Sequence, residues 1–414
     1  MGSPSRRRIG IVSTWFERGA AYVSRQFLEA LQEEHAVFIY GRGGEVSGQG
    51  DPRWDGPQVT WDRGSSLLYP TALDREGFVS WLRTNGIDLV FFNEQRWWPP
   101  VQWCDELGLV TGCYLDYYTR DTIPMFGLYD FLVANTRRHY SVFEWHPNCR
   151  YVPWGTNVDL VRPKTLELAD PPLVTFFHSA GMDPVRKGTD LVLRAFTGFC
   201  GKARLLVHSQ VNLRRALPSL RSLIRRLEAE GCLELITATI PLPGLYHRGD
   251  VYLYPSRLEG IGLSIAEALA AGLPTVITDA PPMNEFADPD SSWLIPVTSV
   301  SERSDGYFWP QCEPDLSALR DTIGRCIQAS AVLPERKRAA RRLAETSRDW
   351  RRNSRCLPEI FAAARPLDGP EKRLARELAS QFQHRPIRRR HRWFQFCPGL
   401  YARLRDLRRK FLAG

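Results

Sequence analysis

The stretch Tyr254-Pro-Ser-Arg-Leu-Glu-Gly-Ile-Gly-Leu-Ser-Ile-Ala-Glu-Ala-Leu-Ala-Ala-Gly-Leu-Pro-Thr-Val276 says most about the fold. It begins at the end of the apolar, aromatic-rich run Val251–Tyr254, which predicts a buried strand. Gly260 and Gly262 predict a loop, and the apolar residues of Leu263–Ala271 predict a helix. Strand, glycine loop and helix in this order are typical of a Rossmann-like unit, whose loop N–H groups and positive helix end suit a phosphate.

Outward from this stretch, short β-rich runs alternate with helical patterns, which predicts parallel sheets with crossover helices. The strands predicted in the first half are Arg8–Thr14, Ala36–Tyr40, Asp88–Asn93, Val110–Leu115, Phe131–Ala134 and Arg150–Pro153, with a helix over Ala21–Glu33. A second series has strands at Leu173–His178, Ala203–His208, Leu233–Thr237, Val251–Tyr254 and Thr275–Thr278, and helices at Asp190–Phe199, Leu217–Glu230 and Leu263–Ala271. The Pro-rich break at 170–172 separates the two series. We therefore expect an α/β protein with two Rossmann-like domains joined near 155–172.

Composition favours an ordinary globular protein. The chain has 414 residues, of which 43% are hydrophobic and 24% charged. No run approaches the ~18 apolar residues of a membrane span, and we see no secretory signal, so we expect a cytoplasmic protein. The nine cysteines include no C-x-x-C pair, which argues against a disulfide framework and a zinc site. Cys113 and Cys200 lie in apolar runs and are expected to be small core residues.

The net charge of +9 is concentrated at the C-terminus. Residues 371–414 hold 13 basic and 3 acidic residues, which leaves 42 basic and 43 acidic residues in 1–370. The body is nearly neutral, so we expect no nucleic acid as a partner.

Two carboxylates accompany the glycine loop. Glu259 precedes Gly260, and Glu267 follows one turn into the predicted helix, so both face one cleft. A carboxylate beside a phosphate is unfavourable unless it binds another group, and sugar hydroxyls are suitable donors. With the flanking Pro-Ser and Ala-x-Gly-x-Pro-x-Val, this segment strongly resembles the E-x7-E signature of retaining GT-B-fold glycosyltransferases (glycosyltransferase family 4, glycosyl transferases group 1) that use nucleotide sugars.

Other segments resemble the same family in the same order. Val152-Pro-Trp-Gly-Thr-Asn-Val-Asp159 is similar to its interdomain P-x-G-V-D segment, and Gly181-Met-Asp-Pro-Val-Arg-Lys-Gly188 is similar to its G-R-x-x-x-x-K-G loop. Gly19 lies where the first glycine loop of the family is expected. The resemblance extends over roughly residues 8–365.

The resemblance implies which residues hold the donor. Lys187 would bind its diphosphate, Glu259 the hydroxyls of the transferred sugar, and Glu267 the ribose hydroxyls. The backbone of Gly262 and Leu263 would contact phosphate. The remaining donor-binding candidates are Arg186, Gly260, Ser264 and Gly19. There is no D-x-D motif in a suitable place, so we expect no essential metal and no cofactor beside the donor substrate.

Two positions depart from the family pattern. Met182 stands where the family loop has arginine, so one phosphate contact is absent or is supplied by Arg186. Asp116 stands after the predicted strand Val110–Leu115, where many members have histidine near the transferred sugar. Asp116 is a candidate catalytic residue, with a plain strand-end carboxylate as the other interpretation.

Aromatic residues crowd the first half of the chain. Trp97 and Trp98 follow a predicted strand, and strand ends of the first domain would line the acceptor side of the cleft. Sugars stack on such rings, so these two tryptophans are the acceptor-binding candidates, against the alternative that they belong to the core.

We therefore predict a retaining hexosyltransferase-type enzyme that moves a sugar from a nucleoside diphosphate to an acceptor hydroxyl in cell-surface polysaccharide or glycoconjugate biosynthesis. The expected units are an acceptor domain at 1–160, a donor domain at 161–345, a helix at 346–370 that packs back toward the first domain, and a basic amphipathic tail at 371–414. Three alternatives are a sugar phosphorylase or epimerase of the same fold, an NAD-dependent dehydrogenase, and an inactive GT-B protein that binds a membrane or partner through its tail. The first strand lacks G-x-G-x-x-G, which argues against the dehydrogenase.

The tail itself has two interpretations. Leu400, Leu404, Leu407 and Phe411 fall on one helical face among arginines. Such a helix suits an anionic membrane surface, which would place the enzyme peripherally at the inner face of the membrane beside a lipid-linked acceptor. The other interpretation is a helix packed on the enzyme or on a second subunit.

Overall fold

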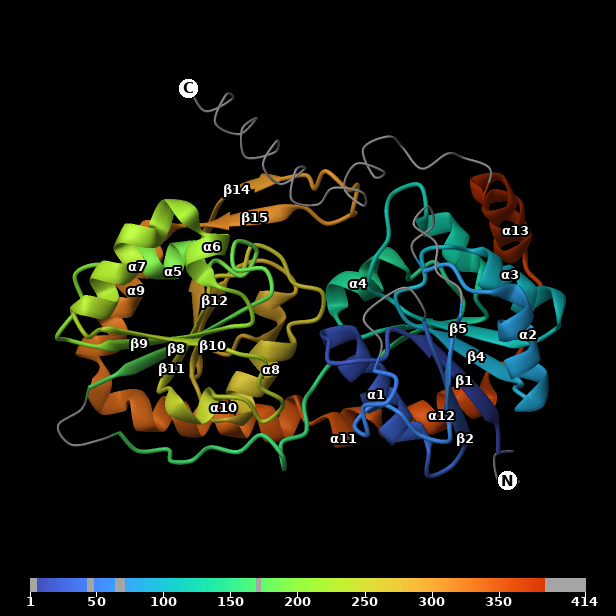
Figure 1. The fold of residues 1–414 in the computed structure, drawn as a ribbon, viewed down its shortest axis with the longest axis horizontal. Helices are drawn as coiled ribbons and strands as arrows, with labels where there is room; N and C mark the ends of the chain where they lie inside the picture. Colours follow the sequence, from blue (N-terminus) through green and yellow to red (C-terminus); the bar gives the residue numbers. More distant parts are fainter. Residues whose placement is uncertain (1–5, 43–47, 64–70, 169–172, 384–414) are drawn as a thin grey trace.

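The computed structural model describes residues 6–42, 48–63, 71–168 and 173–383, which form two α/β domains (Figure 1). The first domain has seven parallel strands in the order β3-β2-β1-β4-β5-β6-β7. They are β1 Arg8–Ser13, β2 Ala36–Gly41, β3 Val59–Trp61, β4 Leu89–Phe92, β5 Val110–Tyr114, β6 Phe131–Ala134 and β7 Cys149–Tyr151. This is the doubly wound order with one more strand at its edge.

The second domain has six parallel strands in the order β10-β9-β8-β11-β12-β13. They are β8 Thr175–Gly181, β9 Arg204–Ser209, β10 Leu233–Thr237, β11 Val251–Tyr254, β12 Thr275–Thr278 and β13 Ser292–Ile295. The expected class, two Rossmann-like domains, is confirmed. All strands of the first sheet precede residue 160 in the sequence, and all strands of the second sheet follow it. The predicted domain boundaries themselves stay predictions. In both sheets the strand order reverses beside the first strand, where β1 neighbours β4 and β8 neighbours β11. Ligands of doubly wound sheets bind beyond the carboxyl ends of the strands at such a switch point.

Helices cover the sheets. In the first domain they are α1 Gly19–Leu31, α2 Arg75–Thr84, α3 Pro99–Glu106, α4 Arg137–Val142 and the 3-10 turn η1 Ile123–Leu128. In the second they are α5 Thr189–Ala195, α6 Leu213–Ala216, α7 Arg221–Ala229, α8 Leu263–Ala270 and α9 Leu316–Gln328, with the 3-10 turns η2 Pro218–Leu220, η3 Tyr246–Arg248, η4 Met283–Phe286 and η5 Ser330–Val332. The spacing of apolar residues explains why Gly19–Leu31 forms a helix, because Val23, Phe27 and Leu31 recur on one face of α1 and are buried.

A hairpin that the sequence did not predict follows β13. Its strands β14 Val297–Ser301 and β15 Gln311–Pro314 are antiparallel, and they extend above the second domain toward the first (Figure 1). These strands are short and polar, so the alternation that marks a half-buried strand is weak.

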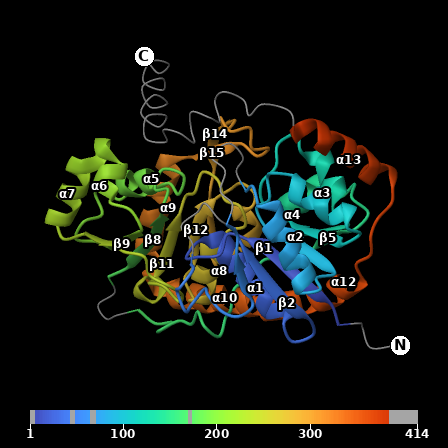
Figure 2. The same ribbon diagram turned by 45° about the vertical axis from the view of Figure 1, so that its right-hand side comes forward.

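The chain then returns to the first domain through α10 Leu333–Ser347, α11 Trp350–Asn353, the turn η6 Ser354–Cys356 and α12 Leu357–Ala363, which run beneath both domains (Figures 1 and 2). The Trp350 ring packs on Phe27 and Trp154, with centroid distances of 5.6 and 4.8 Å. Phe361 packs on Phe91 at 5.1 Å. The amide of Thr156 donates to the carbonyl oxygen of Arg348 at 2.8 Å, so the two segments that connect the domains are joined to each other.

The first part of the basic tail is a helix, α13 Pro370–Gln383, that packs on η1 and α3 of the first domain (Figure 2). Lys372, 2% exposed, binds the buried carboxylate of Asp130 at 2.5 Å and that of Asp105 at 3.1 Å. Residues 371–383 are therefore part of the folded body. The predicted amphipathic stripe at Leu400–Phe411 lies outside the described residues.

The cysteines differ from expectation at one place. Cys113 is buried as predicted, but Cys200 is joined to Cys232 by a disulfide with a Cα–Cα distance of 5.1 Å. The two lie 32 residues apart, a spacing that C-x-x-C patterns do not detect. Within the described ranges, no helix combines the length and the apolarity that a membrane span requires.

Candidate active site

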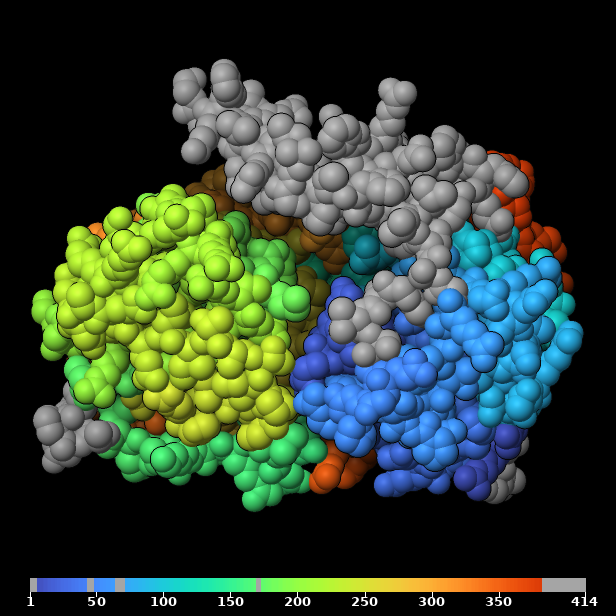
Figure 3. Space-filling model, in the orientation of Figure 1, coloured from blue at the N-terminus to red at the C-terminus, as the bar shows by residue number. Residues whose placement is uncertain are grey.

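A cavity of about 670 Å³ lies between the domains at the two switch points. The space-filling view shows two lobes with a hollow between them (Figure 3). The cavity lining includes ten predicted site residues: Gly19, Asp116, Arg186, Lys187, Glu259, Gly260, Gly262, Leu263, Ser264 and Glu267. Residues from positions 19 to 267 thus meet in one place, because the loops that carry most of them follow the carboxyl ends of parallel strands.

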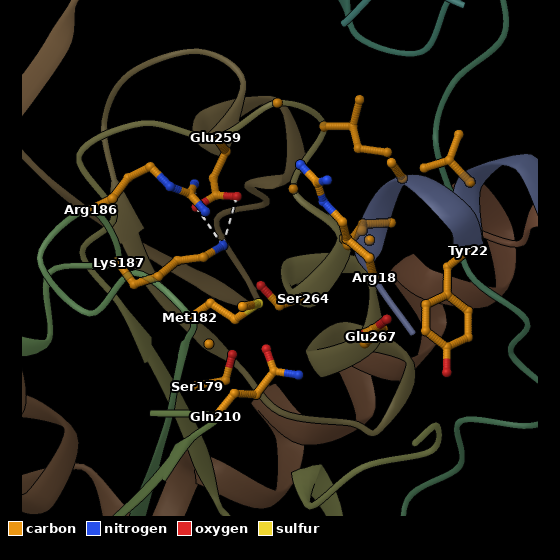
Figure 4. Close-up of a pocket in the computed structure, with 18 of the residues that line it drawn as sticks. Arg18, Tyr22, Ser179, Met182, Arg186, Lys187, Gln210, Glu259, Ser264 and Glu267 are labelled. Carbon is orange, nitrogen blue, oxygen red and sulfur yellow. Dashed lines mark hydrogen bonds and ion pairs between the residues drawn. The ribbon is translucent and has the colours of Figure 1, made fainter. Parts of the chain in front are cut away.

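Lys187 and Glu259 form an ion pair at the cavity wall (Figure 4). The lysine Nζ donates to both carboxylate oxygens, at 2.8 and 2.9 Å. Arg186 Nη1 lies 3.0 Å from Oε1 of the same carboxylate. The hydroxyls of Ser256 and Tyr254 also donate to Oε1, at 2.6 and 2.9 Å. Glu259 is 6% exposed, so this carboxylate is fixed from several sides.

The electrostatics of this pair follow from burial and from its partners. Burial alone would raise the pKa of Glu259, but Lys187 and Arg186 hold it at about 2. Burial, together with the charge of Arg186, lowers the pKa of Lys187 to about 8 although Glu259 opposes the shift. At neutral pH the site therefore contains an ionised carboxylate and a protonated lysine.

The loop after Glu259 leads into α8 with its first backbone N–H groups available. Gly262 precedes the helix with φ of 74°, and no side chain caps it. A Cβ at Gly262 would lie 2.7 Å from Phe286, so this glycine also permits close packing. α1 of the first domain likewise starts without a side-chain cap, and its Gly19 lies against Leu263. Two positive helix ends therefore border the same cleft, an arrangement that favours a phosphate-bearing ligand.

Glu267 lies one turn into α8 and accepts a hydrogen bond of 2.6 Å from the Tyr246 hydroxyl. Burial raises the pKa of Glu267 to about 7, while the bond from Tyr246 and the charge of Lys187 oppose the rise. Near Glu267, the close-up shows Ser179, Met182 and Gln210 at the same cavity (Figure 4).

Asp116, at the end of β5, also lines the cavity. Burial and the charge of Glu94 raise the pKa of Asp116 to about 7, and Arg96 acts in the opposite direction. A carboxyl group that titrates near neutrality is suited to accept a proton or a hydrogen bond from a ligand hydroxyl.

The structure does not bring the two predicted acceptor tryptophans to the cavity. Trp98 is 3% exposed and packs on Phe126 and Tyr129, at 5.4 and 5.9 Å. Trp97 packs on Trp103 at 5.5 Å. Neither belongs to the cavity lining. The aromatic residues that line the cavity are instead Tyr22, Tyr114 and Tyr117 of the first domain, Phe177 and Tyr246 of the second, and Tyr307 of the hairpin.

Sequence reasoning missed the residues of the first domain that hold the Glu259 loop. Arg138 Nη2 donates to the carbonyl oxygen of Glu259 at 2.5 Å, and His139 Nε2 lies 3.2 Å from that of Gly260. Both follow β6, so the run Arg137-Arg138-His139 after a strand end was the available signal. Arg18, beside Gly19, was missed as well although it lines the cavity.

Met182 leaves the Gly181 loop without an arginine in its first position, and its side chain is 69% exposed. Arg186 reaches the cavity from the other end of that loop. Among the described residues, one cluster brings three residues of metal-ligating type together, Cys200, Glu230 and Cys232, but its two cysteines form the disulfide and none of the three lines the cavity. The expectation that no metal is essential stays a prediction.

Comparison with known proteins gives a family match over part of the second domain. The model of the family "Glycosyl transferases group 1" matches residues 173–305, which include Lys187, Glu259 and Glu267. The uncharacterized glycosyltransferase 335 of Sulfolobus islandicus rod-shaped virus 1 is 28% identical over 98 residues, or 24% of this chain. The chain spans 29% of the length of that relative.

Solved structures resemble nearly the whole described chain. Sucrose-phosphate synthase from Thermosynechococcus elongatus matches with a TM-score of 0.65 and 16% identity, over 86% of this chain and 98% of that one. HepE of Anabaena, in complex with UDP and glucose, matches with a TM-score of 0.66 and 13% identity, over 87% and 100% of the two chains. The fold is GT-B. At these identities the GT-B likeness establishes the architecture and not the substrate.

Proposed function

We propose that this GT-B protein is a glycosyltransferase that moves a sugar from a nucleoside diphosphate to an acceptor hydroxyl. The observation that carries the proposal is the Lys187–Glu259 pair beside the open N-terminus of α8, inside the segment that matches the family model. A cation and a positive helix end suit a diphosphate, and an ionised carboxylate 2.8 Å away needs hydroxyl donors rather than a second anion.

The donor roles follow from these positions. Lys187 and the N–H groups at Leu263 would bind the diphosphate, Glu259 would accept hydrogen bonds from the sugar hydroxyls, and Glu267 would accept them from the ribose. The solved HepE structures contain UDP, UDP and glucose, or UDP-glucose, so UDP-glucose is the first donor to test.

The reaction we propose retains the anomeric configuration, as the E-x7-E resemblance implies. The bond between the anomeric carbon and the diphosphate oxygen breaks, and the acceptor oxygen attacks the same face of the oxocarbenium-like sugar. The proton of the acceptor hydroxyl passes to the departing phosphate oxygen. Lys187 and the α8 N-terminus stabilise the negative charge that develops on that oxygen.

Acceptor and cellular place are further parts of the proposal. Thirteen basic residues in 371–414 favour an anionic membrane surface and a lipid-linked acceptor of cell-surface polysaccharide or glycoconjugate assembly. Since Lys372 and Arg376 bind carboxylates of the first domain, the residues after 383 would make the membrane contact.

A panel of nucleotide sugars tests the activity. Purified protein should release nucleoside diphosphate from at least one of them, and the release should survive EDTA because no metal is needed. If no nucleotide sugar in the panel is turned over and no nucleoside diphosphate binds, the proposed function is wrong.

A further inference from the structure

The β14–β15 hairpin crosses from the second domain to the first beside the cavity. Its connecting residues supply Arg303 and Tyr307 to the lining. The Tyr307 hydroxyl donates to the carbonyl oxygen of Asp116 at 3.1 Å, and the Tyr117 hydroxyl donates to that of Asp305, also at 3.1 Å. The two domains therefore exchange hydrogen bonds in both directions at this edge of the site.

Four side chains form a series of stacked contacts at the crossing. The guanidinium of Arg96 lies over the Tyr117 ring, 4.0 Å from its centroid. The rings of Tyr117 and Tyr307 stack at 5.2 Å with an interplanar angle of 14°, and Arg303 lies over Tyr307 at 5.3 Å. Protein groups thus take up the ring faces, so the pair is a barrier rather than a platform on which a sugar can stack.

The hairpin also contacts residues of the first domain, among them Arg138, which holds the Glu259 loop. Trp309 Nε1 donates to the Tyr118 hydroxyl at 2.7 Å, and the Phe308 amide donates to the Tyr118 carbonyl oxygen at 2.9 Å. The Trp309 ring lies 5.0 Å from the guanidinium of Arg138, which binds the carbonyl oxygen of Glu259. A connected set of contacts therefore runs from the hairpin to the Glu259 loop.

We propose that this hairpin is the acceptor-side wall of the transfer site, in which Tyr307 positions the Asp116–Tyr117 segment and keeps bulk water from the transferred sugar. The inference rests on the proposed function, because water competes with the acceptor only where a sugar is transferred. The family match ends at residue 305, so Tyr307, Phe308 and Trp309 lie beyond it.

Three variants test the wall. Tyr307→Ala removes the stack and the hydrogen bond, Tyr307→Phe keeps the ring, and Val300→Ala alters a 64% exposed residue of the same hairpin. Release of nucleoside diphosphate without acceptor is measured with the donor found in the panel, and UDP affinity is measured by calorimetry. We expect Tyr307→Ala to raise release by about fivefold or more at unchanged UDP affinity, because water then reaches the sugar. Val300→Ala should stay close to the wild type. Tyr307→Phe keeps the ring but loses the hydrogen bond to Asp116, so its release should lie between those of the wild type and Tyr307→Ala.

Release at the wild-type rate in Tyr307→Ala, or a fall in release, overturns the wall and leaves the proposed function standing. A wild type that turns over no donor overturns both the wall and the proposed function.

A double-mutant cycle of Tyr117→Ala, Tyr307→Ala and the double variant serves as the control for folding. Because the rings stack, the double variant should lower the melting temperature by less than the sum of the single shifts. Additive shifts in melting temperature would contradict the stacking of the two rings, and therefore also the proposed wall.

Discussion

Glu259 is the residue on which the site depends most. Its carboxylate balances Lys187 and Arg186 and points into the cavity (Figure 4). Glu259→Gln should keep the shape of the loop but lose the interaction with the reacting sugar. We expect turnover to fall by about two to three decades, since one such interaction typically contributes ~2.7–4 kcal/mol in the transition state.

The same variant should bind UDP at least as tightly as the wild type, because a negative charge beside the diphosphate is removed. Calorimetry and steady-state turnover measure the two effects. Glu313→Gln is the matched control, since Glu313 pairs with Arg257 and lies outside the cavity lining. Near-normal turnover in Glu259→Gln would remove Glu259 from the site.

In the proposed site, two groups with pKa values near neutrality should set the pH range of nucleotide binding. Lys187, with a pKa of about 8, loses its charge as pH rises through that value, and the diphosphate loses a cation. Glu267, with a pKa of about 7, becomes neutral as pH falls through that value and then accepts ribose hydroxyls less well. UDP affinity measured by calorimetry should therefore be highest from about pH 7 to about pH 8. Lys187→Arg should remove the alkaline limb and Glu267→Gln the acid limb; unchanged limbs would contradict these assignments.

Most of the predicted residues that the structure brings to the cavity could be predicted because they lie in contiguous motifs. Glu259 and Glu267 have a fixed spacing within one strand, loop and helix. Lys187 lies in a second loop that also follows a strand of the same sheet, so the sequence places the three residues in one cleft. Tyr307 and Arg138 were not predictable in this way, since tertiary contacts alone bring a hairpin of one domain and a helix of the other to the same loop. Trp98 shows the opposite error, because a strand-end aromatic residue can turn into the core as readily as into the cleft.

At the scale of elements, Gly188 lies where the loop of Lys187 packs against the loop of Glu259 in the second domain. Its φ is 72°, and an added Cβ would lie 2.1 Å from the carbonyl oxygen of Pro255. Gly188→Ala should therefore both strain the backbone and push apart the loops of Lys187 and Glu259. We expect a loss of roughly 3 kcal/mol in the free energy of unfolding, together with weaker UDP binding.

Gly201→Ala is the matched control for this prediction. Gly201 has φ of 78°, but nothing lies within 4 Å of an added Cβ. Gly201→Ala should lower the free energy of unfolding only by the cost of its left-handed backbone conformation, about 1–2 kcal/mol. Chemical denaturation measures this loss. Equal losses for the two variants would show that the contact with Pro255 does not matter.

The strands of both sheets were predictable because buried parallel strands are short, nearly continuous apolar runs. The predicted Phe131–Ala134, Leu233–Thr237 and Val251–Tyr254 coincide with β6, β10 and β11. The edge strands β3 and β13 and the hairpin were missed. They are three to five residues long and only partly buried, so neither length nor pattern distinguishes them from loops.

At the scale of the whole molecule, α13 ties the end of the described chain to the first domain. Removing residues 370–414 would leave Asp130, 0% exposed, without Lys372. Loss of one partner of a buried ion pair typically costs about 3–5 kcal/mol, so a 1–369 protein should unfold much more easily than a 1–383 protein. Chemical denaturation of the two truncations measures the difference, and similar stabilities would show that α13 contributes little.

The 1–383 protein also isolates the part of the tail proposed to bind membranes. Full-length protein should co-sediment with vesicles containing phosphatidylserine and be released by high salt, because screening weakens the attraction of basic residues to anionic lipid. The 1–383 protein should stay in solution and still bind UDP. If full-length protein ignores these vesicles, the tail does not hold the enzyme at a membrane.

The central claim is that this cleft transfers a sugar from a nucleoside diphosphate with retention of configuration. A proton NMR time course with the donor found in the panel tests it most directly, because the anomeric signal and its coupling report both turnover and stereochemistry. We expect the donor signal to be replaced by that of a first-formed product with the same anomeric configuration, and Glu259→Gln to produce almost none in the same time. An inverted product, or a product formed equally fast by Glu259→Gln, would contradict it.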